Sequence, residues 1–489
     1  MPGQRIPSER IERRLLRAGL RPRWVGDPPA DLGGLSADSR RVLSGDLFLA
    51  VPGTRVDGHG FLAAAATAGA AAAVVERVID HPLPQLLVAD ARAAVAHLGM
   101  LFAGDPVEDV RLIGVTGTNG KSTTAWLLRW ILASTEPNAA IGTLGIVDAG
   151  GELHPGSMTT PDPIELAFAL ADLRSRGVRT VTLEASSHAL DQHRVDGLRF
   201  AAIGFTSFSR EHLEYHADLE SYRAAKLRLI ELLEPGGICA VNADEPAWRE
   251  VGADGTRTIR YGLTPSAQVR ATDVELGAGG TCLTLSSFGE RARVRLPLPA
   301  EFNVMNALAA VAIAVGLETP LAEVGHRLGE VPPVPGRMEV LCEEPTLVIR
   351  DYAHTPDAYE RVLTMLHGLV DGRVIAVFGC GGERDPGKRP IMGEIATRLA
   401  DLAVVTTDNP RSEDPAQICR QVVGGLDPAS YEIVLDRKDA ISFALDAAGS
   451  DDAVILLGKG HETYQIIGEE RVPFDEAAIV AELAGSVPG

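Results

Sequence analysis

The chain has 489 residues, which is too long for one hydrophobic core and predicts about two to four domains. Hydrophobic residues make up 45% of the chain and charged residues 23%, a globular composition that excludes extensive disorder. The formal net charge of -20 argues against a nucleic-acid partner, because Lys and Arg are needed to hold phosphate backbones.

The cysteines and the apolar segments indicate the cellular compartment in which the protein works. The five cysteines include no C-x-x-C pair and are too dispersed for a zinc site or a disulfide framework, so we expect reduced thiols in a cytoplasmic protein. The Arg-rich stretch Met1–Trp24 lacks the apolar centre of a signal peptide. Ala-rich runs such as Ala63–Val75 are short, so we expect no insertion into a membrane.

The first segment, residues 1–107, mixes short apolar runs with Ala-rich helical stretches. The apolar runs are Asp46–Val51, Ala71–Val75 and Gln85–Val88. Short apolar runs alternating with helical stretches predict an α/β domain that ends near Pro106.

The second segment, residues 108–335, opens with the apolar run Val110–Val115, which predicts a buried parallel strand. A Gly-rich turn follows, and then a helix is expected from Lys121 to about Ala133. Further strands are expected at Arg179–Glu184, Ala201–Thr206 and Ile238–Asn242. Such alternation of strands and helices predicts a parallel sheet, and the alternating pattern of residues 267–298 predicts an antiparallel extension.

The third segment, residues 336–489, follows the Pro-rich stretch Val331–Gly336, which we expect to be a linker or hinge. Strands and helices alternate again, which predicts a second parallel sheet. The expected strands are Thr346–Arg350, Arg373–Phe378, Ala403–Thr407 and Ala453–Leu457, and the expected helices are Asp357–Leu369 and Arg389–Leu399.

The strongest motif is the Gly-rich loop between the strand and the helix that open the second segment. Its glycines let the backbone approach a phosphate closely, and the N-terminus of the following helix offers free N–H groups. Lys121 would reach the β- and γ-phosphates of ATP, and the Ser122 hydroxyl would lie on Mg²⁺. The loop has Val115 where the common G-x-x-x-x-G-K-S/T spacing has Gly, and a tight turn without a ligand is the weaker alternative. The expected ATP-binding residues are Gly117, Thr118, Asn119, Gly120, Lys121, Ser122 and Thr123.

The stretch Thr116–Thr123 resembles the loop of the Mur ligases and the folylpolyglutamate synthases, which activate a carboxylate with ATP as an acyl phosphate that an amine then attacks. Further blocks over most of the chain resemble the Mur ligases. The resemblance implies an α/β fold with three domains. These would be a UDP-sugar-binding domain over 1–107, a central parallel-sheet P-loop ATPase domain over 108–335, and a Rossmann-like amino-acid-binding domain over 336–489.

A polar block, Glu184–Leu190, stands at the end of a predicted strand, where catalytic groups of open α/β sheets gather. Glu184 fits Mg²⁺ as a hard carboxylate ligand. The alternative for the residues after Glu184 is a simple polar turn. The resemblance implies that the UDP-muramoyl dipeptide is held by Ser39, Thr159, Thr160, Ser186, Gln192 and Arg194.

A second block runs from His212 to His216 and is followed by Tyr222–Lys226. It resembles the family block whose lysine is carbamylated, and this implies that Lys226 and His212 hold a second Mg²⁺. Spacing alone would favour a solvated lysine on an amphipathic helix, and the resemblance reverses that preference. The resemblance therefore implies four catalytic residues, which are Lys121, Glu184, His212 and Lys226.

Three short peptides resemble family contacts to ATP. Asn306 would contact the base, Arg337 would lie near the phosphates, and Asp351 would lie near the ribose or at a hinge. Without the resemblance, these peptides look like ordinary turns.

The block Asp408–Pro415 follows a predicted strand and resembles the signature of the Mur ligases that add meso-2,6-diaminopimelate. The Arg411 fork can bind the extra carboxylate of diaminopimelate bidentately, whereas lysine would leave it unpaired at a cost of a few kcal/mol. The alternative is that Asp408–Arg411 only caps the next helix. The expected diaminopimelate contacts are Arg384, Asp408, Asn409, Pro410, Arg411, Gly458 and Glu462.

Together with these residues, the resemblance implies an ATP- and Mg²⁺-dependent ligase that would add meso-2,6-diaminopimelate to UDP-N-acetylmuramoyl-L-alanyl-D-glutamate in peptidoglycan synthesis. We expect it to be a monomer. The nearest alternatives are a ligase that adds lysine or D-alanyl-D-alanine, a folylpolyglutamate synthase, and a non-catalytic nucleotide-binding regulator. The Ser39 region and Asp408–Arg411 argue against the folylpolyglutamate synthase.

Overall fold

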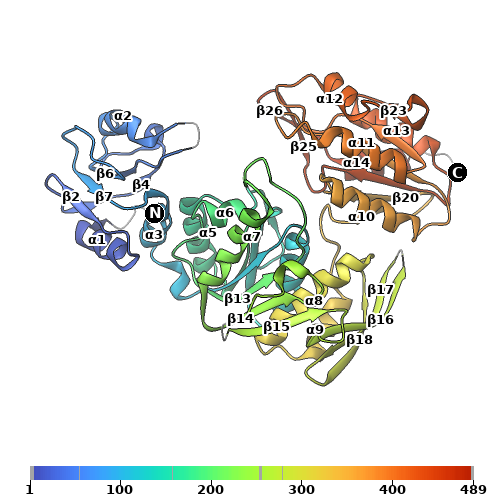
Figure 1. The fold of residues 1–489 in the computed structure, drawn as a ribbon, viewed down its shortest axis with the longest axis horizontal. Coiled ribbons are helices and arrows are strands. Elements are labelled where there is room, and N and C mark those ends of the chain that lie inside the picture. The colour runs from blue at the N-terminus through green and yellow to red at the C-terminus, as the bar shows by residue number, and fades with distance from the viewer. Residues whose placement is uncertain (1–4, 54–55, 157, 253–255, 278, 486–489) are drawn as a thin grey trace.

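The computed structural model describes residues 5–53, 56–156, 158–252, 256–277 and 279–485. Within these residues, larger sheets of five, eleven and six strands follow one another along the chain. We call the parts built on them the N-terminal, central and C-terminal regions. The central region lies between the N-terminal region (blue) and the C-terminal region (orange to red) in Figure 1. None of the described helices is long and apolar enough to cross a membrane.

The N-terminal region is built on the five-stranded sheet β2-β7-β6-β5-β4, which is parallel except at the β2 edge. Alternate residues of a strand face opposite sides of the sheet. Leu47 and Leu49 therefore pack under α1 and α3, whereas Phe48 packs against α2. The elements are α1 (Ser8–Arg17), β2 (Arg23–Val25), β4 (Leu35–Ser36), β5 (Leu47–Leu49), α2 (Leu62–Thr67), β6 (Ala72–Val75), β7 (Gln85–Leu87) and α3 (Ala91–Phe102), with the small pair β1 (Ile6–Pro7) and β3 (Asp31–Leu32).

The eleven-stranded sheet of the central region has the order β11-β10-β9-β12-β8-β13-β14-β15-β16-β17-β18. The strands from β9 to β16 in this order are parallel, and β16, β17 and β18 pair antiparallel, so the antiparallel extension is confirmed. The strands are β8 (Arg111–Thr116), β9 (Asn138–Gly142), β10 (Gly145–Val147), β11 (Leu153–His154), β12 (Thr180–Glu184), β13 (Phe200–Phe205), β14 (Leu233–Asn242), β15 (Arg257–Gly262), β16 (Val269–Gly277), β17 (Gly280–Ser287) and β18 (Glu290–Leu296).

Helices cover both faces of this sheet, which explains why β8 reads as a continuous apolar run. Ile113 of β8 belongs to the core under α4 and α8, and the adjacent Leu112 belongs to the core under α5. The loop after β8 therefore leaves a buried strand at its carboxyl end. The helices are α4 (Lys121–Leu132), α5 (Pro163–Ser175), α6 (Ser187–Asp191), α7 (Leu219–Leu227), α8 (Glu301–Gly316) and α9 (Leu321–Gly329), with the 3₁₀ turn η4 (Arg228–Leu232).

The C-terminal region begins after the loop 331–338 with the sheet β19-β20-β24-β21-β22-β23, which is parallel except at its β19 edge. Helices α10, α11 and α12 pack on one face, and α13 and α14 pack on the other. The elements are β19 (Glu339–Cys342), β20 (Leu347–Asp351), α10 (Pro356–His367), β21 (Val374–Phe378), α11 (Lys388–Leu399), β22 (Leu402–Val405), α12 (Pro415–Val422), β23 (Tyr431–Ile433), α13 (Arg437–Ala447), β24 (Ala453–Leu457), β25 (Tyr464–Ile467), β26 (Glu470–Pro473) and α14 (Glu476–Ala484).

Candidate active site

The Gly-rich loop joins β8 to α4 and requires glycine at two positions. Gly117 has a φ of 146° and Gly120 has a φ of 89°. Residues with a Cβ rarely adopt these backbone conformations. A Cβ at Gly117 would also collide with the Thr206 hydroxyl, and one at Gly120 would collide with the Asn306 amide. The structure thus brings Asn306, from α8, directly against the loop.

Thr118 and Thr123, at the loop and at the start of α4, are buried. The Thr118 hydroxyl donates to the Ser209 carbonyl over 3.2 Å and lies 3.1 Å from the Tyr222 hydroxyl. Thr123 lies in the first turn of α4. These contacts fix the loop before any ligand binds.

Lys121 and Lys226 both point at the same backbone carbonyl. Their Nζ atoms lie 3.0 Å and 2.7 Å from the Gly117 oxygen. Lys226, from the end of α7, is only 1% exposed. Burial lowers its pKa well below the usual lysine value, and the Lys121 ammonium lowers that pKa further. Both effects act against the charged ammonium form of Lys226.

A set of oxygen donors lies beside the loop, at the carboxyl ends of β9 and β12. The Ser122 hydroxyl donates to Glu184 Oε2 over 3.0 Å, and the Thr143 backbone N–H donates to Glu184 Oε1 over 2.9 Å. Arg337, from the loop 331–338 that precedes the C-terminal region, donates to the Ser122 hydroxyl over 3.3 Å. A Cβ at Gly142 would collide with the Glu184 carboxylate, so glycine is needed there too. Hydroxyl and carboxylate oxygens are the ligands that suit Mg²⁺.

His212 belongs to a different cluster. Its ring lies 4.7 Å from that of His188, measured between centroids, and its Nε2 lies 3.7 Å from Glu211 Oε2. In the part of the chain that the structure describes, no hydrogen bond or ion pair joins His212 to Glu184 or Lys226. His212 and Lys226 are nevertheless both close enough to Glu211 to interact with its charge.

Glu211 is a site residue that the sequence analysis missed. Burial alone would raise the pKa of its carboxyl, but surrounding basic groups outweigh burial and lower that pKa. These groups are His212, Lys121, His354 and Lys226. The only local signal was its position directly before His212.

The expected substrate contacts of the central region form one hydrogen-bonded network. The Thr160 hydroxyl donates to the Glu184 carbonyl over 2.7 Å and to the Ser186 hydroxyl over 3.2 Å. Arg194 donates to the Thr160 carbonyl over 3.0 Å and to Gln192 Oε1 over 2.7 Å. This network therefore lies beside the Glu184 cluster.

Thr159 extends the network, whereas Ser39 stands apart from it. The Thr159 hydroxyl lies 3.0 Å from the hydroxyl of Thr143, which touches Glu184. Ser39 begins a 3₁₀ turn of the N-terminal region that Asp38 caps. Among the described residues, no hydrogen bond joins Ser39 to the network.

The C-terminal region contacts the phosphate loop through the start of α10. The Asp357 carboxylate accepts from the Asn119 side-chain amide over 3.2 Å and from the Ser209 hydroxyl over 3.2 Å. Sequence analysis did not single out Asp357, because its partners are more than a hundred residues away. This contact links the position of the C-terminal region to the conformation of the loop.

Asp351 supports the segment that carries Arg337. Its carboxylate accepts from the backbone N–H groups of Met338 over 2.8 Å and Ala353 over 2.7 Å. The Arg337 guanidinium lies 4.3 Å from the centre of the Tyr352 ring. Asp351 therefore holds the end of the loop 331–338 against β20, and its role near the ribose or at a hinge stays a prediction.

Arg411 lies at the edge of the β25–β26 hairpin and has φ of 53°. Its Nη1 donates to the carbonyls of Gly382 over 2.7 Å and Asn409 over 3.4 Å. Among the described residues, no carboxylate pairs with Arg411, so its charge is available to an anionic ligand. Pro410 before it is buried, and the exposed Arg384 likewise has no carboxylate partner within the described chain.

Asn409 and Glu462 are already engaged with a buried lysine that sequence analysis missed. Lys459 is 0% exposed and lies 3.3 Å from Glu462 Oε2 and 3.2 Å from Asn409 Oδ1. Asn409 also donates to Glu462 over 2.8 Å. Asn409 therefore fixes the shape of this site and Lys459 balances the Glu462 charge.

Asp408 lies beside the cluster of Asn409, Lys459 and Glu462. The stretch Asp408–Arg411, to which it belongs, does not cap the next helix. Its Oδ1 lies 3.6 Å from Lys459 Nζ, and its Oδ2 lies close to Gly458, which has φ of 108°. The residue that caps α12 is Asp414, whose side chain accepts from the Ala416 backbone N–H. The alternative in which Asp408–Arg411 only caps that helix is therefore wrong.

Models of protein families match all three regions of the chain. The Mur ligase middle domain matches residues 115–314, and the Mur ligase glutamate ligase domain matches residues 336–460. The catalytic domain of the Mur ligase family matches residues 31–95.

Whole proteins match over nearly the full chain. The UDP-N-acetylmuramoyl-L-alanyl-D-glutamate--2,6-diaminopimelate ligase of Geobacter sulfurreducens is 42% identical, covering 93% of this chain and 95% of its own. The protein of the same name from Halalkalibacterium halodurans is 41% identical, with 94% and 95% covered.

Solved structures agree with this match. A structure of a ligase of the same name has a TM-score of 0.66 at 32% identity, covering 93% of this chain and 95% of that one. MurF from Acinetobacter baumannii shares the fold, with a TM-score of 0.65 at 21% identity. The match covers 99% of this chain and 100% of that one. With sequence identity of this extent, the chain belongs to the Mur ligase family.

Proposed function

We propose that this chain is the ATP-dependent ligase that joins 2,6-diaminopimelate to UDP-N-acetylmuramoyl-L-alanyl-D-glutamate in peptidoglycan synthesis. The observation that carries this proposal is the 42% identity, over 93% of the chain, to a ligase of that name. The unpaired Arg411 guanidinium supports it from the chemistry of the site, because diaminopimelate offers a carboxylate that lysine lacks.

Each region would bind one reactant. Residues 1–107 would hold the UDP-sugar through Ser39, residues 108–335 would hold ATP, and residues 336–489 would hold the amino acid. The stretch Val331–Arg337 would be the hinge about which the third domain delivers the amine. The contact of Asp357 with Asn119 supports this coupling, because it joins the third domain to the phosphate loop.

ATP would bind with its phosphates in the Gly117–Gly120 loop and its base near Asn306. Lys121 would stabilise the charge that spreads over the transferred phosphoryl group, so that catalysis is largely positioning and electrostatics. Arg337 would reach the same phosphates, since its guanidinium already contacts Ser122. Asp351 would keep the Arg337 segment in place.

The donor set around Glu184 fits Mg²⁺. Ser122 and Glu184 would hold the ion, and Thr143 would orient the carboxylate through its backbone N–H. When bound, Mg²⁺ would neutralise phosphate charge and draw electron density from the γ-phosphorus. The fit rests on oxygen donors only, and the described cluster contains no softer ligand.

We assign Lys226 as a carbamate. The neutral amine attacks the carbon of CO₂, and the proton that leaves nitrogen passes to solvent, which gives a carboxylate in place of an ammonium. Burial and Lys121 favour the neutral amine that this step needs. The product would attract Lys121 instead of repelling it, and it could share a second Mg²⁺ with His212.

The reaction would run in two balanced steps. The side-chain carboxylate of the D-glutamate unit attacks the γ-phosphorus, and ADP leaves with the bond electrons. The amine of diaminopimelate then attacks the acyl carbon, phosphate leaves, and the amine proton goes to solvent or phosphate. The network of Thr159, Thr160, Ser186, Gln192 and Arg194 would hold the acceptor beside Glu184.

The amino acid would bind between Arg411 and the buried Lys459. Arg411 and Arg384 would take its far carboxylate, and Asp408 and Glu462 would face ammonium groups. Asn409, Pro410 and Gly458 would set the shape of the pocket. Lys459 forms ion pairs with both carboxylates, 3.3 Å from Glu462 and 3.6 Å from Asp408, so it would balance part of the charge of each.

Phosphate release from ATP with the UDP-muramoyl dipeptide tests the proposal. We expect release that depends on meso-2,6-diaminopimelate and is much weaker with L-lysine. Equal rates with both amines would contradict the specificity, and ATP binding without turnover in the presence of all substrates would favour a regulator. We further propose that the protein is a monomer, which sedimentation of the purified protein would test. We also propose that it is cytoplasmic, which fractionation of the cells that express it would test.

A further inference from the structure

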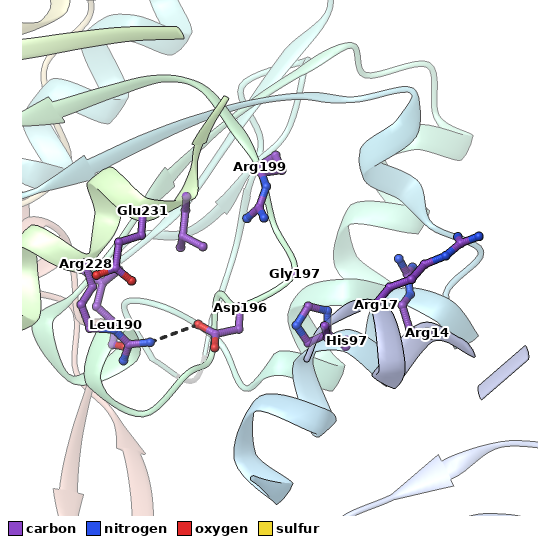
Figure 2. A pocket seen from close by; sticks show the side chains of 11 residues that line it. Arg14, Arg17, His97, Leu190, Asp196, Gly197, Arg199, Arg228 and Glu231 are labelled. Atoms are coloured by element: carbon purple, nitrogen blue, oxygen red, sulfur yellow. Dashed lines mark hydrogen bonds and ion pairs between the residues drawn. The ribbon is translucent and has the colours of Figure 1, made fainter. Parts of the chain in front are cut away.

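A cavity of about 420 Å³ lies where the N-terminal region meets the central region (Figure 2). It is separate from the phosphate loop and from the Glu184 cluster, none of whose residues line it. Helices α1 and α3 form one side, and the loop before β13 and the turn η4 form the other. The charged or polar side chains that line it are Arg14, Arg17, His97, Asp196, Arg199, Arg228 and Glu231.

Two of the four arginines are paired within the protein. Arg14 forms an ion pair with Asp105, and Arg228 Nη2 lies 3.5 Å from Asp196 Oδ1, the contact drawn as a dashed line in Figure 2. These pairs tie each side of the cavity to its own region. They leave the paired arginines with free N–H donors but little net charge.

The other two arginines have no acid to neutralise them. Among the described residues, neither Arg17 nor Arg199 pairs with a carboxylate, and the Arg199 guanidinium donates only to the Leu198 carbonyl over 3.1 Å. Glu231 is an exposed carboxylate that lines the cavity, and no arginine within the described chain pairs with it. The cavity is therefore net positive in a chain of net charge -20, where isolated cations should otherwise find acidic partners.

Repulsion among these cations is visible in Arg14. Burial lowers its pKa, the neighbouring Arg10 and Arg17 lower that pKa further, and Glu108 opposes them. An anion in the cavity would relieve this repulsion. Arginine forks from opposite sides would suit it, because each can donate two parallel hydrogen bonds to a phosphate or carboxylate group.

The two sides of the cavity approach closely at Gly197. This residue has φ of 81°, and a Cβ there would lie 2.8 Å from His97 Nδ1. Burial lowers the pKa of His97, so its ring is neutral and can donate from one nitrogen. Glycine thus allows a loop of the central region to meet α3 beside the arginines.

We propose that this cavity binds a small multivalent oxyanion, carrying phosphate or carboxylate groups, between Arg17 and Arg199. Such a ligand would join the N-terminal region to the central region. The floor of the cavity is also connected to the substrate network, because Arg228 donates to the carbonyls of Leu190 and Asp191, next to Gln192.

Calorimetric titration of the full-length protein with inorganic pyrophosphate and, separately, with citrate tests this site. Saturating ADP is present throughout, so that the nucleotide site is filled. Mg²⁺ is left out, because pyrophosphate and citrate both chelate it and the heat of chelation would mask binding to the protein. The double variant Arg17→Ala/Arg199→Ala removes the unpaired cations, and both residues are exposed, so folding should be unaffected. The control Arg13→Ala/Arg291→Ala removes the same charge from exposed positions outside the cavity.

We expect binding of at least one probe that weakens about 100-fold in the cavity variant and stays unchanged in the control. Preference for pyrophosphate would identify phosphate recognition, and preference for citrate would identify carboxylate recognition. No binding to the unmodified protein, or equal affinity in the two double variants, would overturn the proposal. Neither outcome depends on the ligase reaction, so the two proposals can fail separately.

Discussion

Arg411→Ala should selectively weaken the use of diaminopimelate. The guanidinium is half-buried and donates only to the carbonyls of Gly382 and Asn409 among the described residues. A bidentate pair with the far carboxylate would add two charge-assisted hydrogen bonds, together about 3 kcal/mol. This corresponds to about a 150-fold loss in kcat/KM for diaminopimelate.

Amino-acid-dependent phosphate release at varied diaminopimelate measures this loss directly. The KM for ATP should stay within about threefold, because Arg411 has no contact with the phosphate loop. Arg420→Ala is the matched control, since Arg420 is exposed on the neighbouring α12 and pairs only with Asp414 at 3.5 Å. An unchanged kcat/KM for diaminopimelate, or an equal rise in both KM values, would refute the assignment.

Three further changes test the rest of the site and its support. Lys226→Ala should abolish the carbamate NMR signal obtained with ¹³C-bicarbonate and should lower kcat about 100-fold. Because burial lowers the pKa of Lys226, this signal in the unmodified protein should grow as the pH rises through that lowered pKa. A carbamate signal that is retained in the variant would contradict the assignment. Glu184→Gln should raise the Mg²⁺ concentration for half-maximal phosphate release about 100-fold, and an unchanged Mg²⁺ dependence would exclude Glu184 as a ligand. Glu476→Ala leaves the fully buried Arg437 without its 2.8 Å partner and should lower the free energy of unfolding by about 3–5 kcal/mol in urea titrations, whereas a loss below about 1 kcal/mol would show that the pair is not needed.

Local patterns in the sequence predicted the elements that carry the loop and the strand-end residues. The strand expected at Val110–Val115 is β8, and the helix expected from Lys121 is α4, so the loop between them is placed as expected. This succeeded because a buried parallel strand is a continuous apolar run and because glycine is required where φ is positive. The same reasoning found the strand that ends at Glu184.

The contacts that complete the site could not be predicted, because they join residues far apart in the chain. Thr143 reaches Glu184 only because β9 and β12 are neighbours in the sheet. Lys459 neutralises Glu462 and also contacts the Asn409 side chain, which lies about fifty residues earlier in the chain. Polar residues of this kind look like ordinary loop residues until the fold buries them.

The hairpin β25–β26 was missed for a different reason. Its strands, Tyr464–Ile467 and Glu470–Pro473, are short and mostly exposed, so they lack an apolar run. The signal that could have found it is Gly468, which turns the chain with φ of 61°. The hairpin positions Arg411, whose backbone N–H donates to the Ile466 carbonyl.

The central claim is tested most directly by the mass of the UDP-muramoyl product. The reaction contains the UDP-muramoyl dipeptide, ATP and Mg²⁺, with meso-2,6-diaminopimelate and L-lysine in equal amounts. Our account predicts one product, the dipeptide extended by diaminopimelate, because only this amine offers a carboxylate to Arg411. A product extended mainly by lysine, or unextended dipeptide alone, would contradict it.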